Sequence, residues 1–542
     1  MNADGAPGRR RKFWGWGYEG DGLGEDEIRA LAVRIGPQLG TLEPRVASPP
    51  RLEELRLRPP RVRPPAGLAP FSSDAARDRA EHALGKSYRD LVRGLRREYA
   101  HPPDFVAYPG DEEELAAVLD WASGARVAVV PYGGGSSVVG GIEPDVGDGY
   151  AGAISVDLRR MSRVLEIDRA SRAALIEAGT LGPALEAQLR PHGLTLRHFP
   201  QSFEFSSLGG WIATRSGGHY ATLFTHIDEF VEGLRVLTPR GALETRRLPG
   251  DGAGVSPDRL FIGSEGILGV ITRAWMRLQD RPRFRASASV TFASFVEAAE
   301  AARELAQSGL WPANCRLLDP TETVVAGVGD GSRSLLIVGF ESADHPLDPW
   351  LARAIEICRG HRGTVAAEEA AGAPDRPGAR AGAAGRWREV FIRGGHLHDA
   401  MVRLGLVNET FETAVTWDRF PEFHAGVLEA TRRAVEQVCG RGLVSCRFAY
   451  VYPDGPAPYY TVVAPGRPGS ELEQWAAIKE AASEALLRLG GTITHHHAVG
   501  RDHRPWYDRQ RPAPFAEALR AAKRALDPAG VMNPGVLVDP PS

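Results

Sequence analysis

Several features that define other classes of protein are scarce or missing in this sequence. No apolar run approaches the ~18 residues that a membrane-spanning helix needs, so we expect a soluble protein. Residues 1–8 lack the apolar core of a signal peptide, and the final Pro-Pro-Ser is not the peroxisomal address Ser-Lys-Leu. The four cysteines, Cys315, Cys358, Cys439 and Cys446, have no CxxC spacing, which argues against a zinc site and a disulfide scaffold. We therefore expect a cytoplasmic protein, and a peripheral membrane contact stays open.

Lysine is also scarce, because only four of the 65 basic residues are lysine. The excess of arginine is more typical of a GC-rich coding bias than of a function. The 65 basic and 68 acidic residues give a net charge of −3, which argues against nucleic-acid binding, since such proteins carry a concentrated basic face. The length of 542 residues, 43% of them hydrophobic, is typical of a globular chain of several domains.

The first 280 residues predict short strands at close intervals, with helices between them. Apolar residues at helical spacing predict a helix within 74–99, after an arm that contains the aromatic-glycine segment 13–18. A second helix starts at the acidic residues 111–114 and should end at Gly124. A third starts at Pro183 and ends before Gly193. The predicted strands are 127–130, 154–157, 164–168 and 174–178. This pattern indicates an α+β fold and not a regular βαβ repeat.

The rest of the chain predicts a second domain and a returning C-terminal segment. Strands are expected at 286–292, 334–340 and 460–463, and helices at 295–307, 422–439, 472–489 and 514–526. Residues 366–385 have no periodicity and should form a loop. A histidine-rich strand is expected over 492–499. We divide the chain into an N-terminal arm and helical region (1–100), a first domain (101–280), a second domain (281–490) and a C-terminal segment (491–542).

A glycine-rich motif follows the buried strand at 127–130. Its sequence is PYGGGSS, residues 131–137. Successive glycines let backbone N–H groups turn toward an anion such as a diphosphate, and two serines add hydroxyl donors. The motif is not a dinucleotide GxGxxG, because Val138 stands three residues after Gly135, and it has no P-loop lysine. An isolated triple glycine is more often an ordinary turn, so the motif alone does not establish a site.

Three further segments favour a cofactor site. They are 200–211, 214–218 and 263–271, and all are rich in glycine, serine or threonine. Together with an Ala-Gly-Thr at 178–180, the motifs PYGGGSS, SSLGGW, TRSGG and GSEGILGVI resemble the PCMH-type FAD-binding domain of the vanillyl-alcohol-oxidase superfamily. Within it, WGWGY at 14–18, SLGGWIATR at 207–215, TFETAVTWD at 410–418 and THHHAVG at 494–500 resemble the alkyldihydroxyacetonephosphate synthases. The resemblance runs from residue 14 to about residue 534.

The resemblance implies the architecture and the cofactor. The α+β chain should form a two-subdomain PCMH-type FAD-binding domain over 101–280 and an α/β cap of the FAD-linked oxidase C-terminal type over 281–490, with 491–542 returning to the active site. FAD should be bound non-covalently, because residues 131–137 contain no histidine. The implied cofactor-binding residues are Pro131, Tyr132, Gly133, Gly134, Gly135, Ser136, Ser137, Gln201, Ser202, Phe203, Glu204, Phe205, Ser206, Ser207, Thr214, Arg215, Ser216, Gly217, Glu265, Gly266, Ile267, Leu268, Gly269, Val270 and Ile271.

The resemblance also implies the substrate-binding and catalytic residues. Arg393 matches an arginine that holds the substrate phosphate, and a planar guanidinium suits a phosphate dianion. Arg316 matches a further arginine of the family and is taken as a second substrate-binding residue. Tyr459 matches a proton donor or acceptor. A solvated surface arginine is an equal alternative for Arg393. Tyr460 competes with Tyr459, because only one of two adjacent strand residues faces a site.

The triplet His495, His496 and His497 is implied to be catalytic or substrate-orienting. On a strand, the first and third of these side chains would share one face, so the three could not ligate one metal ion together. No acidic residue flanks them before Asp502, and we expect no metal site. Structural packing is the alternative role. His219, His226, His396 and His398 stay unassigned.

The resemblance implies an FAD-dependent transferase of ether-lipid synthesis. It would exchange the acyl group of acyl-dihydroxyacetone phosphate for a long-chain alkoxy group from a fatty alcohol, and it would be a homodimer with a possible peripheral membrane contact. Gln201 replaces the usual Asp, Ala498 replaces a Gly, and the ending MNPGV at 532–536 is closer to flavin-linked 2-hydroxyacid dehydrogenases. The alternatives are therefore an FAD-linked D-2-hydroxyacid (lactate or glycolate) dehydrogenase or oxidase, which usually carries Gly-Glu-His-Gly, and a flavin-binding scaffold without activity.

Overall fold

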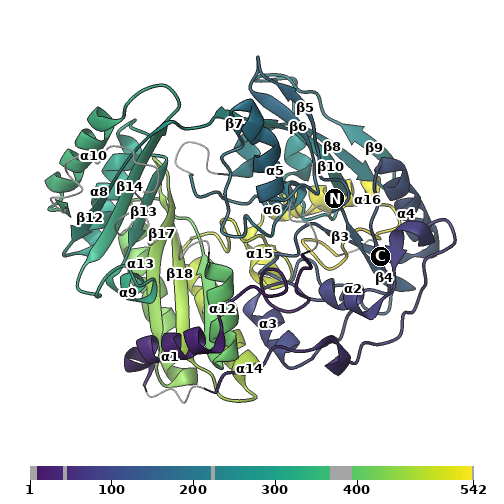
Figure 1. Ribbon diagram of the computed structural model, residues 1–542, viewed down its shortest axis with the longest axis horizontal. Coiled ribbons are helices and arrows are strands. Elements are labelled where there is room, and N and C mark those ends of the chain that lie inside the picture. The colour runs from purple at the N-terminus through teal and green to yellow at the C-terminus, as the bar shows by residue number, and fades with distance from the viewer. Residues whose placement is uncertain (1–8, 41–44, 221–225, 366–392, 540–542) are drawn as a thin grey trace.

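The computed structural model describes residues 9–40, 45–220, 226–365 and 393–539, and these form two lobes (Figure 1). One lobe holds residues of the first domain, with the C-terminal helices against it, and the other is built on a single large sheet. None of the helices in these ranges is long and apolar enough to cross a membrane. The loop predicted over 366–385 lies outside the described residues.

The first lobe contains a four-stranded sheet that positions the glycine-rich motif. Its order is β1 (Ser72–Ser73), β2 (Val106–Ala107), β4 (Gly152–Asp157) and β3 (Val127–Tyr132), and the last three are parallel. The side chains at 127–130 are fully buried, as expected for a short parallel strand covered on both faces. Helix α4 (Glu112–Ala125) packs beside β3, and the Asp111 carboxylate caps it by accepting a hydrogen bond from the Glu114 N–H at 2.9 Å.

A five-stranded antiparallel sheet completes this lobe. Its order is β5 (Val164–Asp168), β6 (Ala173–Glu177), β10 (Val270–Arg277), β8 (Val231–Thr238) and β9 (Gly241–Glu244). Helices α5 (Gly182–Leu189) and α6 (Leu208–Thr214) contribute to the apolar core that joins the two sheets. A two-stranded ribbon, β7 (Leu194–Thr195) with β11 (Gln279–Asp280), leads into the second lobe.

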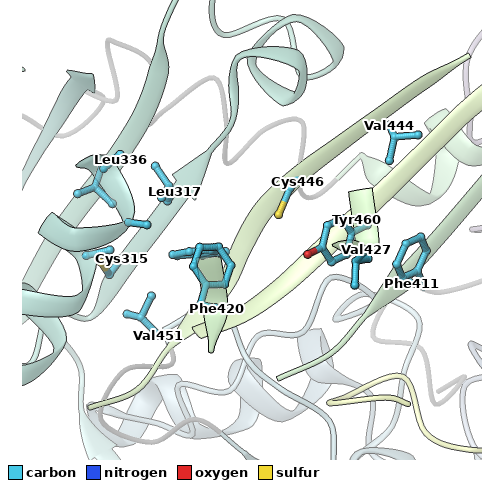
Figure 2. Packing of buried hydrophobic residues seen from close by; sticks show 14 of the residues in the cluster. Cys315, Leu317, Leu336, Phe411, Phe420, Val427, Val444, Cys446, Val451 and Tyr460 are labelled. Atoms are coloured by element: carbon cyan, nitrogen blue, oxygen red, sulfur yellow. The ribbon is translucent and has the colours of Figure 1, made fainter. Parts of the chain in front are cut away.

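The second lobe is a seven-stranded antiparallel sheet covered by helices. Its order is β15 (Thr364–Val365), β12 (Phe284–Phe292), β14 (Ser334–Ser342), β13 (Asn314–Leu318), β17 (Leu443–Val451), β18 (Pro456–Pro465) and β16 (Leu406–Glu412). Helices α8 (Phe295–Gln307), α10 (Asp348–Gly360), α13 (Phe420–Cys439) and α14 (Glu471–Arg488) share one core with it. Figure 2 shows Phe420 and Val427 of α13 packed among strand residues that include Cys446 and Tyr460.

Both chain ends tie the lobes together. Helix α1 (Glu25–Leu39) packs its apolar face on α12 (Gly394–Arg403) and on the ends of β16 and β18. After α15 (Arg504–Gln510) and α16 (Ala513–Leu526), the chain returns to the first lobe. There the Val129 N–H donates to the Val531 carbonyl at 2.8 Å, and the Asn533 N–H donates to the Val129 carbonyl at 2.9 Å. The C-terminal segment therefore adds to the edge of the four-stranded sheet beside β3.

Most predicted elements are confirmed, and some strands are longer than expected, but three details were wrong. The helix predicted within 74–99 is two helices, α2 (Ala76–Glu81) and α3 (Tyr88–Leu95), because Gly85 packs against the backbone of the glycine-rich motif and Ser87 caps a new helix. Helix α4 passes through Gly124, and Arg126 adopts the left-handed conformation that ends it. The histidine triplet forms no strand.

Candidate active site

A cavity of about 360 Å³ lies between the two lobes. The first lobe lines it with the glycine-rich motif and with residues of 200–217 and 264–271. The second lobe lines it with side chains of β13, β16, β17, β18, α9 (Pro320–Val325) and α12. The histidine segment and Asn533 close the remaining side. Four parts of the sequence that are far apart therefore meet at one site.

The glycine-rich motif presents bare backbone to the cavity, and all of residues 131–137 line it. A methyl group on Gly133 would lie 2.1 Å from Ser207 Oγ, and one on Gly134 would lie 1.8 Å from the Phe205 carbonyl oxygen. Gly135 adopts a φ of 72°, which favours glycine. Side chains are thus excluded on one side of the loop, which leaves its N–H groups and the hydroxyls of Ser136 and Ser137 for an anion.

The segment 201–207 backs the motif and leads into α6. Gln201, Ser202, Phe205, Ser206 and Ser207 line the cavity. Trp211 Nε1 donates to Ser206 Oγ at 2.6 Å, which fixes the turn. Of the other predicted cofactor residues in this region, Thr214, Ser216 and Gly217 line the cavity. Phe203 and Glu204 do not line it, and the half-exposed Arg215 forms an ion pair with the buried Asp228.

Glu265 joins the third motif to the C-terminal segment. Its two carboxylate oxygens accept the N–H groups of Val499 and Gly500, each at 2.8 Å, and its own carbonyl accepts from Asn533 Nδ2 at 2.7 Å. Burial raises the pKa of Glu265 to about 7. Glu265, Gly266, Gly269, Val270 and Ile271 line the cavity, whereas Ile267 and Leu268 belong to the core behind it. This side of the site suits a flat ring system with a diphosphate, because small residues leave room beside anion-binding backbone.

Cross-strand neighbours in the second lobe bring three polar side chains together. Tyr459 on β18 lies opposite Glu412 on β16 and opposite Arg447 on β17, and opposite residues share one face of a sheet. The Arg447 guanidinium carbon lies 3.7 Å from the centre of the Tyr459 ring. Arg447 Nη1 donates to Glu322 Oε1 at 2.6 Å. Burial raises the pKa of Tyr459, and the charge of Arg447 opposes that rise.

Glu412 holds the histidine triplet in an irregular loop. Its carboxylate accepts the backbone N–H groups of His495, His496 and His497 at 2.7, 3.1 and 3.0 Å, and the Thr494 hydroxyl at 2.6 Å. The expected alternation of a strand is therefore wrong: one carboxylate collects three successive N–H groups, which an extended strand would point to opposite sides. His496 and His497 line the cavity, and His495 lies behind them.

The two predicted substrate arginines have different positions. Arg316 on β13 is 2% exposed and lines the cavity, with its guanidinium carbon 5.3 Å from the centre of the Tyr450 ring. Burial lowers the pKa of Arg316 to about 10. Arg393 precedes α12, is half exposed and forms an ion pair with Glu27 at 3.4 Å, so it does not line the cavity. The structure brings Arg316, but not Arg393, to Tyr459 and the histidines.

The sequence reasoning missed Glu412, Glu322 and Arg447. Each acts through a partner far away in the chain, and a single sequence carries no signal of such long-range pairs. Glu412 could have been identified from the sequence, since it belongs to the TFETAVTWD segment that supported the resemblance. No acidic residue flanks the histidines along the chain, but the carboxylate of Glu412 lies next to them in space. Among the described residues, Glu412, His495 and His496 form one of two groups whose ligand atoms lie close enough to one another to hold a metal ion.

Comparisons with known proteins agree with this geometry. Residues 103–246 match the family model described as an FAD binding domain, and residues 281–537 match that described as FAD linked oxidases, C-terminal domain. The chain carries an FAD binding domain followed by an FAD-linked oxidase C-terminal domain. Its cofactor is FAD, and the bare-backbone loop and small-residue wall fit that group. The α+β fold with an FAD-binding domain and a FAD-linked oxidase C-terminal domain is confirmed.

The relatives of this chain include proteins named alkyldihydroxyacetonephosphate synthase, as the motifs predicted. The one from Trypanosoma brucei brucei is 29% identical, over 98% of this chain and 93% of the relative, and the one from Dictyostelium discoideum is 28% identical, over 90% and 83%. The glycolate oxidase subunit GlcD of Bacillus subtilis is 25% identical, over 81% and 89%.

Solved structures share the fold of this chain. A solved alkyldihydroxyacetonephosphate synthase has a TM-score of 0.79 at 25% identity, and the match covers 97% of this chain and 98% of the other. Substrate-bound p-cresol methylhydroxylase has a TM-score of 0.64 at 14% identity, over 96% and 98% of the two chains, and this likeness concerns the fold alone.

Proposed function

We propose that this protein is an FAD-dependent alkyldihydroxyacetonephosphate synthase that acts in ether-lipid synthesis. Its reaction exchanges the acyl group of acyl-dihydroxyacetone phosphate for the alkoxy group of a long-chain alcohol. The observation that carries the proposal is the group of Tyr459, Arg447 and the histidine loop on Glu412, which faces the glycine-rich motif across one cavity. Relatives with this name match nearly the whole chain, including the segments that hold these residues.

The reaction balances without net oxidation. The bond between C1 and the acyl oxygen breaks, a bond between C1 and the alcohol oxygen forms, and the fatty acid leaves. Bound FAD supplies electron-pair chemistry beside C1, and the protein provides binding, orientation and proton transfer. Tyr459 is the proton donor or acceptor near C1, with Arg447 favouring its ionised form. Arg316, a buried cation in the wall, attracts the phosphate dianion.

The long chains of both substrates need an apolar passage. Leu31 of α1, Leu397 and Met401 of α12 and Val325 of α9 line one end of the cavity. The proposal includes access from a membrane surface by peripheral contact, a cytoplasmic location and a homodimer. Flotation with phospholipid vesicles tests the first of these, and light scattering tests the last.

The second candidate is an FAD-linked oxidoreductase of D-2-hydroxy acids such as lactate or glycolate. It is favoured by the Met532-Asn-Pro-Gly535 ending, whose Asn533 side chain donates to the Glu265 carbonyl at the cavity, and by the similarity to the glycolate oxidase subunit. The triplet on Glu412 argues against it, because it stands where such enzymes usually have Gly-Glu-His-Gly.

One assay separates the two candidates. Purified holoprotein is given palmitoyl-dihydroxyacetone phosphate and labelled hexadecanol, and in a parallel reaction D-lactate or glycolate with a dye acceptor. The proposal expects labelled hexadecyl ether and released palmitate, with no dye reduction. Dye reduction without ether product would overturn it in favour of the second candidate.

A further inference from the structure

Four side chains form a chain of contacts from the cavity wall to the surface of the first lobe. His496 Nδ1 lies 3.2 Å from His495 Nδ1, and His495 Nε2 lies 3.1 Å from His226 Nε2. His226 Nδ1 lies 3.7 Å from Asp228 Oδ1. His496 lines the cavity, whereas the other three lie behind it. No role was predicted for His226 from the sequence. Its contact with the histidine triplet indicates one.

One set of tautomers satisfies every contact in this row. His496 Nδ1 also lies 3.2 Å from Glu412 Oε2, a carboxylate oxygen that only accepts. A proton on His496 Nδ1 would meet this carboxylate, make His495 Nδ1 an acceptor and leave the His495 proton on Nε2. That N–H points to His226 Nε2 and to the Tyr452 hydroxyl, which lies 2.6 Å away. His226 then has its proton on Nδ1, on the side of Asp228.

The outer end of the row, at His226 and Asp228, lies just below the surface of the first lobe. His226 Nδ1 and Asp228 Oδ1 are buried, and neither has a hydrogen-bond partner among the described residues. A movement of about 0.7 Å would bring them to hydrogen-bond length. Asp228 Oδ2 accepts from Arg259 Nη1 at 2.6 Å and from Arg215 Nη2 at 3.2 Å. The side chains of both arginines are more than half exposed, whereas that of Asp228 is buried, so Asp228 lies one ion pair below the surface.

The backbone fixes the position of His226 relative to the cofactor side of the site. His226 pairs with Gly217 in an isolated antiparallel bridge, and the N–H of Ile227 donates to the Ser216 carbonyl at 3.0 Å. Tyr450 stacks on the other side of His495, with ring centres 5.1 Å apart. Burial lowers the pKa of His226 to about 4 and that of His495 well below its usual range. Both rings are therefore neutral at rest, the state in which imidazole accepts at one nitrogen and donates from the other.

The reaction of the proposed function produces a proton inside the cavity. The alcohol loses its hydroxyl proton when its oxygen bonds to C1, and the fatty acid leaves as a carboxylate at neutral pH, since a carboxylic acid has a pKa near 4. Each turnover thus releases one proton.

We propose that His495, His226 and Asp228 form an exit relay that carries this proton from His496 to solvent. The proton enters His496 at Nε2, the Nδ1 proton of His496 passes to His495 Nδ1, the Nε2 proton of His495 passes to His226 Nε2, and the Nδ1 proton of His226 passes to Asp228, which releases it to water. The three imidazoles, now protonated on the opposite nitrogens, return to their resting tautomers by proton exchange before the next turnover. His226 and Asp228 are positioning and relay residues that do not touch the substrate. The relay rests on the proposed function.

The relay is tested with His226→Gln and His226→Asn, in which an amide replaces the imidazole and cannot pass a proton between two nitrogens. The exposed residue His192, remote from the cavity, gives the matched control His192→Gln. We expect kcat for ether formation to fall about tenfold or more in the His226 variants with KM within about twofold, and added imidazole to restore much of it in His226→Gly, which leaves room for the free base. The control should keep wild-type kinetics.

A second readout does not depend on turnover. In holoprotein labelled with ¹⁵N at histidine, the wild type should give His495 and His226 side-chain shifts of neutral rings, with His495 protonated at Nε2, and replacement of His226 should move the His495 signals. Wild-type kcat in a folded His226 variant, a loss in His226→Gly that imidazole does not restore, or His495 signals that do not respond would each overturn the relay. Absence of ether product in the wild type would instead overturn the proposed function, and the ¹⁵N measurement would still decide whether the tautomers of the relay exist.

Discussion

Tyr459 and Tyr460 are adjacent on β18 but have different surroundings. Tyr459 faces the cavity, beside Arg447 and 5.4 Å from His497 between ring centres. Tyr460 faces the core, stacks on Phe411 with ring centres 5.0 Å apart, and contacts His424 Nδ1 through its hydroxyl at 3.2 Å. Strand alternation predicted that only one of the pair faces the site but could not decide which, because both residues have the same type and a period of two gives no direction. Only the family resemblance pointed to Tyr459.

Tyr459→Phe should lower turnover by about 10²- to 10⁴-fold, because it removes the phenolic proton and leaves the ring in place. FAD should stay bound, which the yellow absorbance of the purified protein will report. The matched control is Tyr460→Phe, which should keep activity and lose about 1 kcal/mol of stability with its buried hydrogen bond. Full activity in Tyr459→Phe would remove this tyrosine from the reaction.

Glu412→Gln should disorganise the histidine loop, because an amide presents one acceptor oxygen where the carboxylate now serves four donors. We expect a loss of about 3 kcal/mol in the free energy of unfolding, together with most of the activity. The histidines hold the pKa of Glu412 well below its ordinary 4.5 in the fold, although burial opposes this. Its contribution to stability is therefore present above pH 4.5 and is lost as the pH falls below that value.

Thermal unfolding between pH 3 and pH 7 checks this sign. The melting temperature of the wild type should fall more steeply below pH 4.5 than that of Glu412→Gln, and the two curves should run parallel above it. Parallel curves over the whole range would mean that the pKa of Glu412 is the same in the folded and the unfolded protein.

Element by element, the sequence predicted most strands and helices but not the loops that form the site. The buried strand β3 and its glycine-rich motif were both evident, because composition and spacing are local signals. The histidine segment was misjudged as a strand, because its shape is set by Glu412 from β16, 83 residues earlier in the chain at His495. The break between α2 and α3 likewise depends on contact with the backbone of the glycine-rich motif.

Gly134→Ala should abolish FAD binding or weaken it at least tenfold. The new methyl group would overlap the Phe205 carbonyl, at 1.8 Å, and one of the two loops must move. A tenfold loss corresponds to about 1.4 kcal/mol, less than the strain expected from such an overlap. Flavin content after gel filtration measures the effect.

The control for that substitution is Gly124→Ala, which lies inside α4 with open space around the position. Alanine is the better helix former, so this variant should gain about 0.5–1 kcal/mol and keep its FAD. If Gly134→Ala kept full flavin content, residues 131–137 would not be a tight cofactor loop.

At the scale of the whole molecule, the N-terminal segment connects the two lobes at the cavity. The N–H of Trp16 donates to Asp399 of α12 at 2.8 Å, and its ring lies 6.1 Å from that of Phe205 in the first lobe. Arg11 Nη1 donates to the Gly133 carbonyl at 3.2 Å. Only the family resemblance marked this segment as significant, since aromatic residues near a terminus do not reveal which surfaces they join.

Trp16→Ala should therefore destabilise the holoprotein by about 3–5 kcal/mol, because a buried indole between two lobes leaves a cavity. The control Trp350→Ala, at a position 37% exposed, should change stability by about 0.5 kcal/mol or less. Urea unfolding followed by flavin fluorescence and circular dichroism measures both. Equal stability of the two variants would show that residues 9–21 do not join the lobes.

The measurement that tests the central claim most directly is the fate of the alcohol oxygen. Holoprotein is incubated with palmitoyl-dihydroxyacetone phosphate and hexadecanol labelled with ¹⁸O, and the products are analysed by mass spectrometry. Exchange at C1 predicts an alkyl product that is heavier by the ¹⁸O label and palmitate that is unlabelled. Label in the palmitate, or no ether product while a D-2-hydroxy acid is oxidised, would contradict the account.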